Sequence, residues 1–186
     1  TFAIMSGVAC VGVNKFTDAL TTAGTDGRDV YWNQDFVMTL TRKQLRFVVL
    51  HESFHKALRH CSEYQEICKR EPKASNIAMD YVVNSFIAEA DPQHTFIDFP
   101  TKPEPLLHPK YFGWSFIEVL RDLLQNPPPD GGKGGGTLDE HKMGELDGDA
   151  QALTAQEISD AIHQGDILVK KLAGNESRND VLDRKS

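Results

Sequence analysis

Two histidines and a glutamate stand at a spacing that suits metal catalysis. Residues 51–55 read His-Glu-Ser-Phe-His, which is the pattern HExxH. In an α-helix, residues four apart are offset by only about 40° around the axis, so His51 and His55 would share one face and could bind the same cation. Glu52 is displaced by about 100° and would lie beside that cation. The motif therefore predicts a zinc ion held by both imidazoles, with Glu52 as the general base that activates a water molecule.

The residues around the motif favour a buried helix. Thr41 and Gln44 form a Ser/Thr-x-x-Glu/Gln capping box, which predicts that the helix begins at about Arg42. An apolar stripe with helical spacing follows: Leu45, Val48, Val49, Phe54 and Leu58. Buried imidazole and carboxylate groups are unfavourable unless they have partners, and one metal ion would satisfy both histidines. The alternative is that these groups only form structural hydrogen bonds.

A catalytic zinc ion usually has three protein ligands, and the next helix offers the third. This helix is predicted over residues 75–90, with Ser75 as its N-cap. Asn76, Asp80 and Asn84 recur on it every four residues and so share one stripe. Asp80 is therefore the candidate third ligand, and Asn76 and Asn84 are expected to support neighbouring groups through hydrogen bonds.

His60 is the alternative third ligand, because it follows His55 by only five residues. On a helix that continued through Arg59, its side chain would point about 140° away from His55. A role in capping the C-terminal end of the helix is then favoured over metal binding. A separate zinc site formed by His60, Cys61 and Cys68 is a further alternative.

Three segments occur in an order and spacing that resemble a known family. They read Ala-Gly-Thr-Asp-Gly-Arg-Asp-Val-Tyr-Trp-Asn at 23–33, His-Glu-Ser-Phe-His-Lys-Ala-Leu-Arg-His at 51–60, and Asn-Ile-Ala-Met-Asp-Tyr-Val-Val-Asn at 76–84. The resemblance is to the "putative metallopeptidase domain" of bacteria and phages, which is often fused to a von Willebrand factor A-like domain. It covers about residues 20–125.

The resemblance implies a zincin-like fold and a zinc-dependent hydrolase. It makes His51 and His55 metal ligands, Glu52 the general base and Asp80 the third ligand, and it matches His60 to a histidine of the family. The chain stops at residue 186, before a von Willebrand-like domain could follow, so a protein partner would be absent or would act in trans.

The elements around the motif predict an α+β fold that is mainly helical, with a small N-terminal β-sheet. The apolar residues 2–13 predict a buried strand, and residues 28–32 predict a short strand after a turn at 26–27. Further helices are predicted over residues 114–124 and, from a capping box that starts at Thr154, to about residue 172.

A Pro/Gly-rich stretch at residues 126–137 predicts a flexible linker between two parts of the chain. A metallopeptidase core would occupy residues 1–125. Residues 138–186 would form a lid-like segment and a C-terminal helix with a polar tail. If the lid closes over the metal, His141 could donate a hydrogen bond to the oxyanion that forms during hydrolysis.

Composition narrows the class of protein and its compartment. The formal charge of −7 over 186 residues, without a Lys/Arg-rich block, argues against unspecific nucleic-acid binding. No apolar run approaches the roughly 18 residues that a membrane span needs. The three cysteines are odd in number and form no CxxC pair, which favours a reduced, cytoplasmic setting.

The predicted function is hydrolysis of peptide bonds in a protein or peptide substrate, with Zn²⁺ as cofactor. Two other functions are compatible with the same residues. One is a catalytically silent, metal-stabilised module that binds a protein partner, and the other is a hydrolase of a non-peptide amide.

Overall fold

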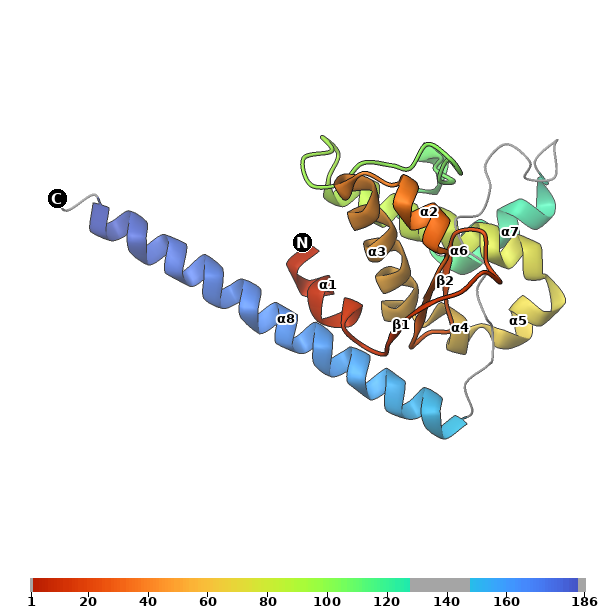
Figure 1. The fold of residues 1–186 in the computed structure, drawn as a ribbon, viewed down its shortest axis with the longest axis horizontal. Coiled ribbons are helices and arrows are strands. Elements are labelled where there is room, and N and C mark those ends of the chain that lie inside the picture. Colours follow the sequence, from red (N-terminus) through yellow and green to blue (C-terminus); the bar gives the residue numbers. More distant parts are fainter. Residues whose placement is uncertain (1, 128–147, 184–186) are drawn as a thin grey trace.

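The HExxH residues lie on helix α3 (Arg42–Ala57), which contacts both the sheet and the helices around it (Figure 1). The computed structural model describes residues 2–127 and 148–183. The side chain of Thr41 accepts a hydrogen bond from the backbone N–H of Gln44, and the side chain of Gln44 accepts one from the N–H of Thr41. This reciprocal cap satisfies two backbone donors at the helix start. The predicted start at Arg42 is confirmed.

A three-stranded sheet packs beside α3 through its edge strand β2. The strands are β1 (Asn14–Phe16), β2 (Ala23–Thr25) and β3 (Val30–Trp32), in the order β1-β3-β2. β3 runs parallel to β1 and antiparallel to β2. Between β2 and β3 the carboxylate of Asp26 accepts hydrogen bonds from two backbone N–H groups, and Gly27 adopts φ +98°, which glycine tolerates well. The predicted turn at residues 26–27 is confirmed, and the predicted strand is present but starts at Val30 rather than at residue 28.

The N-terminal segment is a helix, and the predicted strand over residues 2–13 is wrong. Helix α1 (Phe2–Ala9) contacts both α3 and α8, and Figure 1 shows it lying between them. Its residues are apolar at almost every position, and a uniformly apolar run cannot distinguish a buried helix from a buried strand by periodicity. Small residues such as Gly7 let its backbone approach a neighbouring helix closely.

Helix α8 (Gly148–Asp183) starts earlier and ends later than predicted. Thr154, the predicted N-cap, is inside the helix and buried, where its hydroxyl accepts a hydrogen bond from Arg28. Gly165 does not divide the helix. It lies where α8 packs against Ile4 of α1.

Helix α6 (Pro72–Ala90) carries the predicted aspartate and asparagine stripe and packs against α3. It begins three residues before the predicted N-cap Ser75, because Pro72 occupies the first helical turn, where its fixed φ suits the helix and no donor is lost. The remaining helices are α2 (Gln34–Thr39), α4 (His60–Glu63), α5 (Gln65–Arg70), the 3₁₀ helix η1 (Pro109–Tyr111) and α7 (Phe116–Gln125).

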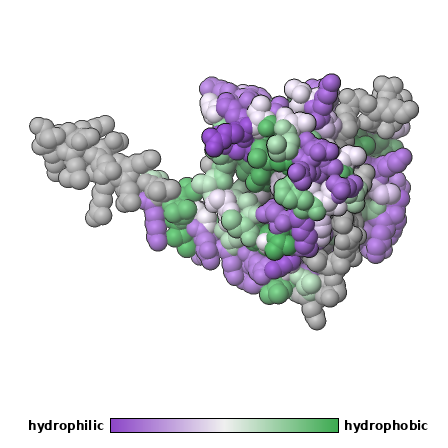
Figure 2. All heavy atoms as spheres, viewed as in Figure 1, coloured by the Kyte–Doolittle hydropathy of each residue, from purple (hydrophilic) through white to green (hydrophobic). Residues whose placement is uncertain are grey.

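Two groups of buried apolar side chains form the core. One joins α1, α3, the sheet and the C-terminal half of α6, and the other joins α6, η1 and α7. Hydrophilic side chains are mixed with apolar ones over the face seen in Figure 2. Among the helices of residues 2–127 and 148–183, none combines the length and apolar character needed to span a bilayer. The expected α+β class with a small sheet is confirmed.

Candidate metal centre

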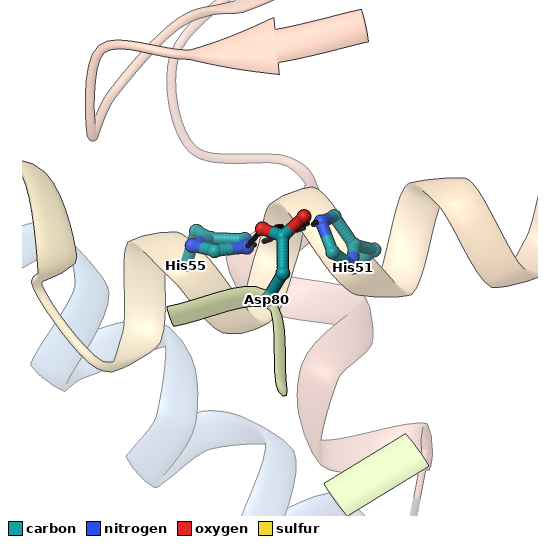
Figure 3. A group of neighbouring side chains, drawn as sticks. All are labelled: His51, His55 and Asp80. Atoms are coloured by element: carbon teal, nitrogen blue, oxygen red, sulfur yellow. Dashed lines mark hydrogen bonds and ion pairs between the residues drawn. The ribbon is translucent and has the colours of Figure 1, made fainter. Parts of the chain in front are cut away.

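Three side chains from α3 and α6 converge in the interior. The Nε2 atoms of His51 and His55 lie 3.1 Å apart, and Asp80 Oδ1 lies 3.7 Å from the first and 3.6 Å from the second. Figure 3 shows both imidazoles projecting from α3 toward the carboxylate. All three residues are 0% exposed. The helical spacing of the motif thus produces the shared face that the sequence predicts.

The triangle formed by these three atoms fits a small cation. A tetrahedral ion with ligands at about 2.0–2.2 Å separates neighbouring ligand atoms by about 3.3–3.6 Å. The observed separations of 3.1, 3.6 and 3.7 Å bracket that range. Two imidazole nitrogens and one carboxylate oxygen are also donors that divalent metals accept. His51, His55 and Asp80 could therefore hold a metal ion.

Asn84 fixes the orientation of the first histidine. Its side-chain Nδ2 donates to the carbonyl of Leu106 at 2.8 Å, so its Oδ1, 2.9 Å from His51 Nδ1, is the acceptor in that contact. His51 then carries its proton on Nδ1 and presents the Nε2 lone pair to the site. Burial lowers the pKa of His51, against the opposing effects of Asp80 and Asn84, and keeps the ring neutral. Asn76 lies one turn before Asp80 and is half-buried, and its supporting role stays a prediction.

His60 lies behind the second histidine because α3 ends early. The helix stops at Ala57, and Arg59 adopts the left-handed conformation with φ 54° and ψ 35°. This reversal brings His60 back toward α3, and its Nδ1 lies 2.9 Å from His55 Nδ1. The expectation that His60 would point away and cap the end of α3 is wrong. No sequence signal could have shown this, because an arginine rarely adopts a positive φ.

His60 is 2% exposed and remains neutral around neutral pH. Burial lowers the pKa of His60 to about 3. Its contact is with the Nδ1 side of the His55 ring, whereas the Nε2 side faces Asp80. His60 is not part of the three-residue group that could hold a metal ion.

Comparison with protein families agrees with this geometry. A family model described as "Putative metallopeptidase domain" matches residues 3–177. The chain belongs to this family. No curated protein and no solved structure matched the chain. Membership of the metallopeptidase domain family and the His51–His55–Asp80 group together indicate a metal-dependent peptidase, whose substrates are proteins or peptides.

In this metallopeptidase domain, Glu52 is buried next to the first histidine and has a charged neighbour that the sequence analysis missed. Lys56, one turn later on α3, is 1% exposed, and its Nζ donates to the carbonyls of Val11 at 2.8 Å and Arg28 at 3.3 Å. Burial lowers the pKa of Lys56, and the carboxylate of Glu52 acts in the opposite direction. A lysine in the last turn of a helix usually indicates an exposed residue, so the pattern gave no sign of this role.

Two further predictions concern His141 and the cysteines Cys61 and Cys68. His141, with the rest of residues 128–147, falls outside the described residues, and so do most of the predicted linker and lid. Within the part of the chain that the structure describes, His60, Cys61 and Cys68 do not form a metal-binding group. The thiol of Cys61 instead donates to the carbonyl of Thr25 at 3.5 Å.

Proposed function

We propose that this protein is a zinc-dependent metallopeptidase of the HExxH type with a zincin-like arrangement. His51, His55 and Asp80 hold the ion, and Glu52 is the general base. The observation that carries the proposal is the buried triangle of two Nε2 atoms and one carboxylate oxygen, 3.1 to 3.7 Å apart. Membership of the metallopeptidase family supports it independently.

The chemistry divides between the ion and the protein. A bound zinc ion supplies Lewis acidity, which makes water acidic enough to lose a proton near neutral pH and polarises the peptide carbonyl. Glu52 accepts the proton of the attacking water while the water oxygen bonds to the carbonyl carbon. When the C–N bond breaks, Glu52 delivers the same proton to the leaving amine nitrogen. One carboxylate thus serves as base and then as acid.

The position of Glu52 suits this role. It follows His51 directly, so it lies about 100° around α3 from the face that carries both histidines. It is 1% exposed, and electrostatic interactions are stronger in such an interior than in water. Glu52 is not part of the His51–His55–Asp80 group, so the proposal gives its carboxylate the proton-transfer role rather than a ligand role.

Replacing Glu52 with Gln tests the assignment. The variant should retain its zinc. Its rate of peptide hydrolysis should fall by about 10²- to 10⁴-fold, because glutamine keeps the shape of the side chain but cannot accept the proton. Zinc content is measured by elemental analysis, and cleavage is followed on unfolded casein with and without a chelator. Glu66→Gln, an exposed change of the same chemistry on α5, is the matched control and should match wild type. Full chelator-sensitive activity in Glu52→Gln would contradict the proposal.

The burial of the ligands favours one alternative function. Ligands that are 0% exposed also suit a structural ion, in which case the protein would be a catalytically silent, metal-stabilised module that binds a partner protein. Zinc removal would then lower the melting temperature, and no casein cleavage would be found in either wild type or Glu52→Gln. Chelator-sensitive cleavage by the wild type excludes this alternative.

A further inference from the structure

We propose that His60 is a positioning residue that holds His55 in the tautomer able to bind the metal ion. The inference rests on the proposed zinc site but adds a role that family membership does not assign. It starts from one contact, the 2.9 Å separation between His60 Nδ1 and His55 Nδ1 in a fully enclosed position.

The position of a single proton decides whether His55 can bind a cation. A neutral imidazole carries one proton, on either Nδ1 or Nε2. His55 Nε2 faces His51 Nε2 and Asp80 Oδ1. To bind an ion between these atoms, it must present a lone pair there, and its proton must then sit on Nδ1. That proton then points at His60 Nδ1, which accepts it. If the bond ran in the opposite direction, the His55 proton would sit on Nε2 and point at the position of the ion.

His60 is held in place for this contact. The left-handed Arg59 turns the chain back toward α3. The imidazole of His60 packs against the rings of Tyr64 and Phe116, with centroids at 6.3 and 6.1 Å, and these two rings also contact each other. The two nitrogens of His55 lie on different sides of its ring, so a residue in contact with Nδ1 cannot share an ion with Nε2. His60 therefore acts through His55 and is not a third ligand.

The first histidine has an equivalent support. Asn84 Oδ1 accepts the Nδ1 proton of His51 at 2.9 Å and is itself fixed by donation to the Leu106 carbonyl. Each histidine ligand thus has a buried acceptor behind it. Such outer partners fix ring orientation, and their loss typically lowers metal affinity by about 10- to 100-fold.

Two substitutions of His60 distinguish its role as a hydrogen-bond acceptor from its contribution to packing. In His60→Asn, the side-chain Oδ1 takes nearly the place of histidine Nδ1 and can accept the same proton. In His60→Leu, the volume is kept and the acceptor is lost. We expect zinc affinity, measured by competition with a chromogenic chelator, to fall about 10- to 100-fold in His60→Leu and to stay within a few-fold of wild type in His60→Asn. X-ray absorption should show two imidazole ligands in all three proteins.

Long-range ¹H–¹⁵N NMR correlation on the zinc-loaded protein tests the tautomers of both rings. We expect His55 to be protonated on Nδ1 in wild type and His60→Asn, and His60 on Nε2 in wild type. Protonation of His60 on Nδ1 in the zinc-loaded wild type would overturn the inference, whatever the zinc affinity.

Other outcomes would also overturn it. Three imidazole ligands in wild type would make His60 a ligand. Equal zinc affinities in all three proteins, with lower melting temperatures in the variants, would make its role structural only. Failure of the wild type to bind zinc would refute the proposed function, whereas normal zinc binding with an unaffected His60→Leu would refute only the positioning role.

Discussion

The candidate ligands are polar groups that have been completely removed from water. Burying a carboxylate is strongly unfavourable unless a positive charge or several hydrogen-bond donors compensate for it. Asp80 is 0% exposed and faces two imidazole nitrogens, of which His51 Nε2 carries a lone pair. A divalent cation between these atoms would supply a compensating positive charge. This electrostatic requirement is the physical link between the buried triangle and metal binding.

Replacement of Asp80 by Ala should therefore weaken zinc binding by more than about 100-fold, the upper range for loss of an outer partner. The measurement is the same chelator competition, and Glu89→Ala, an exposed change on the same helix, is the control. Unchanged zinc affinity in Asp80→Ala would show that Asp80 is not the third ligand.

The position of α3, which carries His51 and His55, depends on the close packing of α1 against α3 and α8. α1 lies against α3 and is held from the other side by α8. At this crossing a Cβ atom on Gly7 would lie 2.9 Å from the carbonyl oxygen of Ala161, and one on Gly165 would lie 2.7 Å from that of Ile4. These contacts are too short for a side chain. The two glycines allow the helices to approach each other and thereby fix the position of α1 against α3.

Gly165→Ala should destabilise the protein although alanine is the better helix former. The gain in helix propensity is about 1 kcal/mol, whereas forcing a methyl group into a packed contact typically costs about 1–3 kcal/mol. We expect a net loss of about 1 kcal/mol in the free energy of unfolding, measured by urea denaturation. The neighbouring exposed change Gln164→Ala should stay within about 0.5 kcal/mol of wild type. A more stable Gly165→Ala protein would show that α1 and α8 leave enough space for a methyl group where they cross.

At the scale of the whole molecule, the carboxylate of Asp91 connects the end of α6 to the segment that returns to α3. Asp91 accepts hydrogen bonds from the N–H and hydroxyl of Thr95 and from the N–H groups of Phe96 and Ile97. Burial of the carboxyl opposes ionisation, but these hydrogen bonds outweigh it and lower the pKa of Asp91. Ile97, which this arrangement positions, is 0% exposed in the core around α3.

Because the pKa of Asp91 is lower in the folded than in the unfolded protein, its ionised form stabilises the fold. That contribution is complete above the unfolded pKa of about 3.9 and is lost as the pH falls toward the folded pKa. Asp91→Asn should therefore lower the melting temperature at pH 6–7, and the difference from wild type should shrink below about pH 4. A difference that does not depend on pH would show that the hydrogen bonds do not require the charge.

Helix α3 with its capping box, and the two histidines on one face of it, follow from the amino-acid pattern alone. The position of Asp80 on the following helix can also be predicted from the sequence, because helix periodicity and capping depend on residues only three or four positions apart. The roles of His60 and Lys56 and the helical state of residues 2–9 could not be read in this way. The role of His60 depends on the left-handed conformation of Arg59, which is rare for arginine. Lys56 is buried against the carbonyls of Val11 and Arg28, and α1 is enclosed between α3 and α8. Contacts between residues far apart in the chain leave no local period, so they became visible only once the chain was folded.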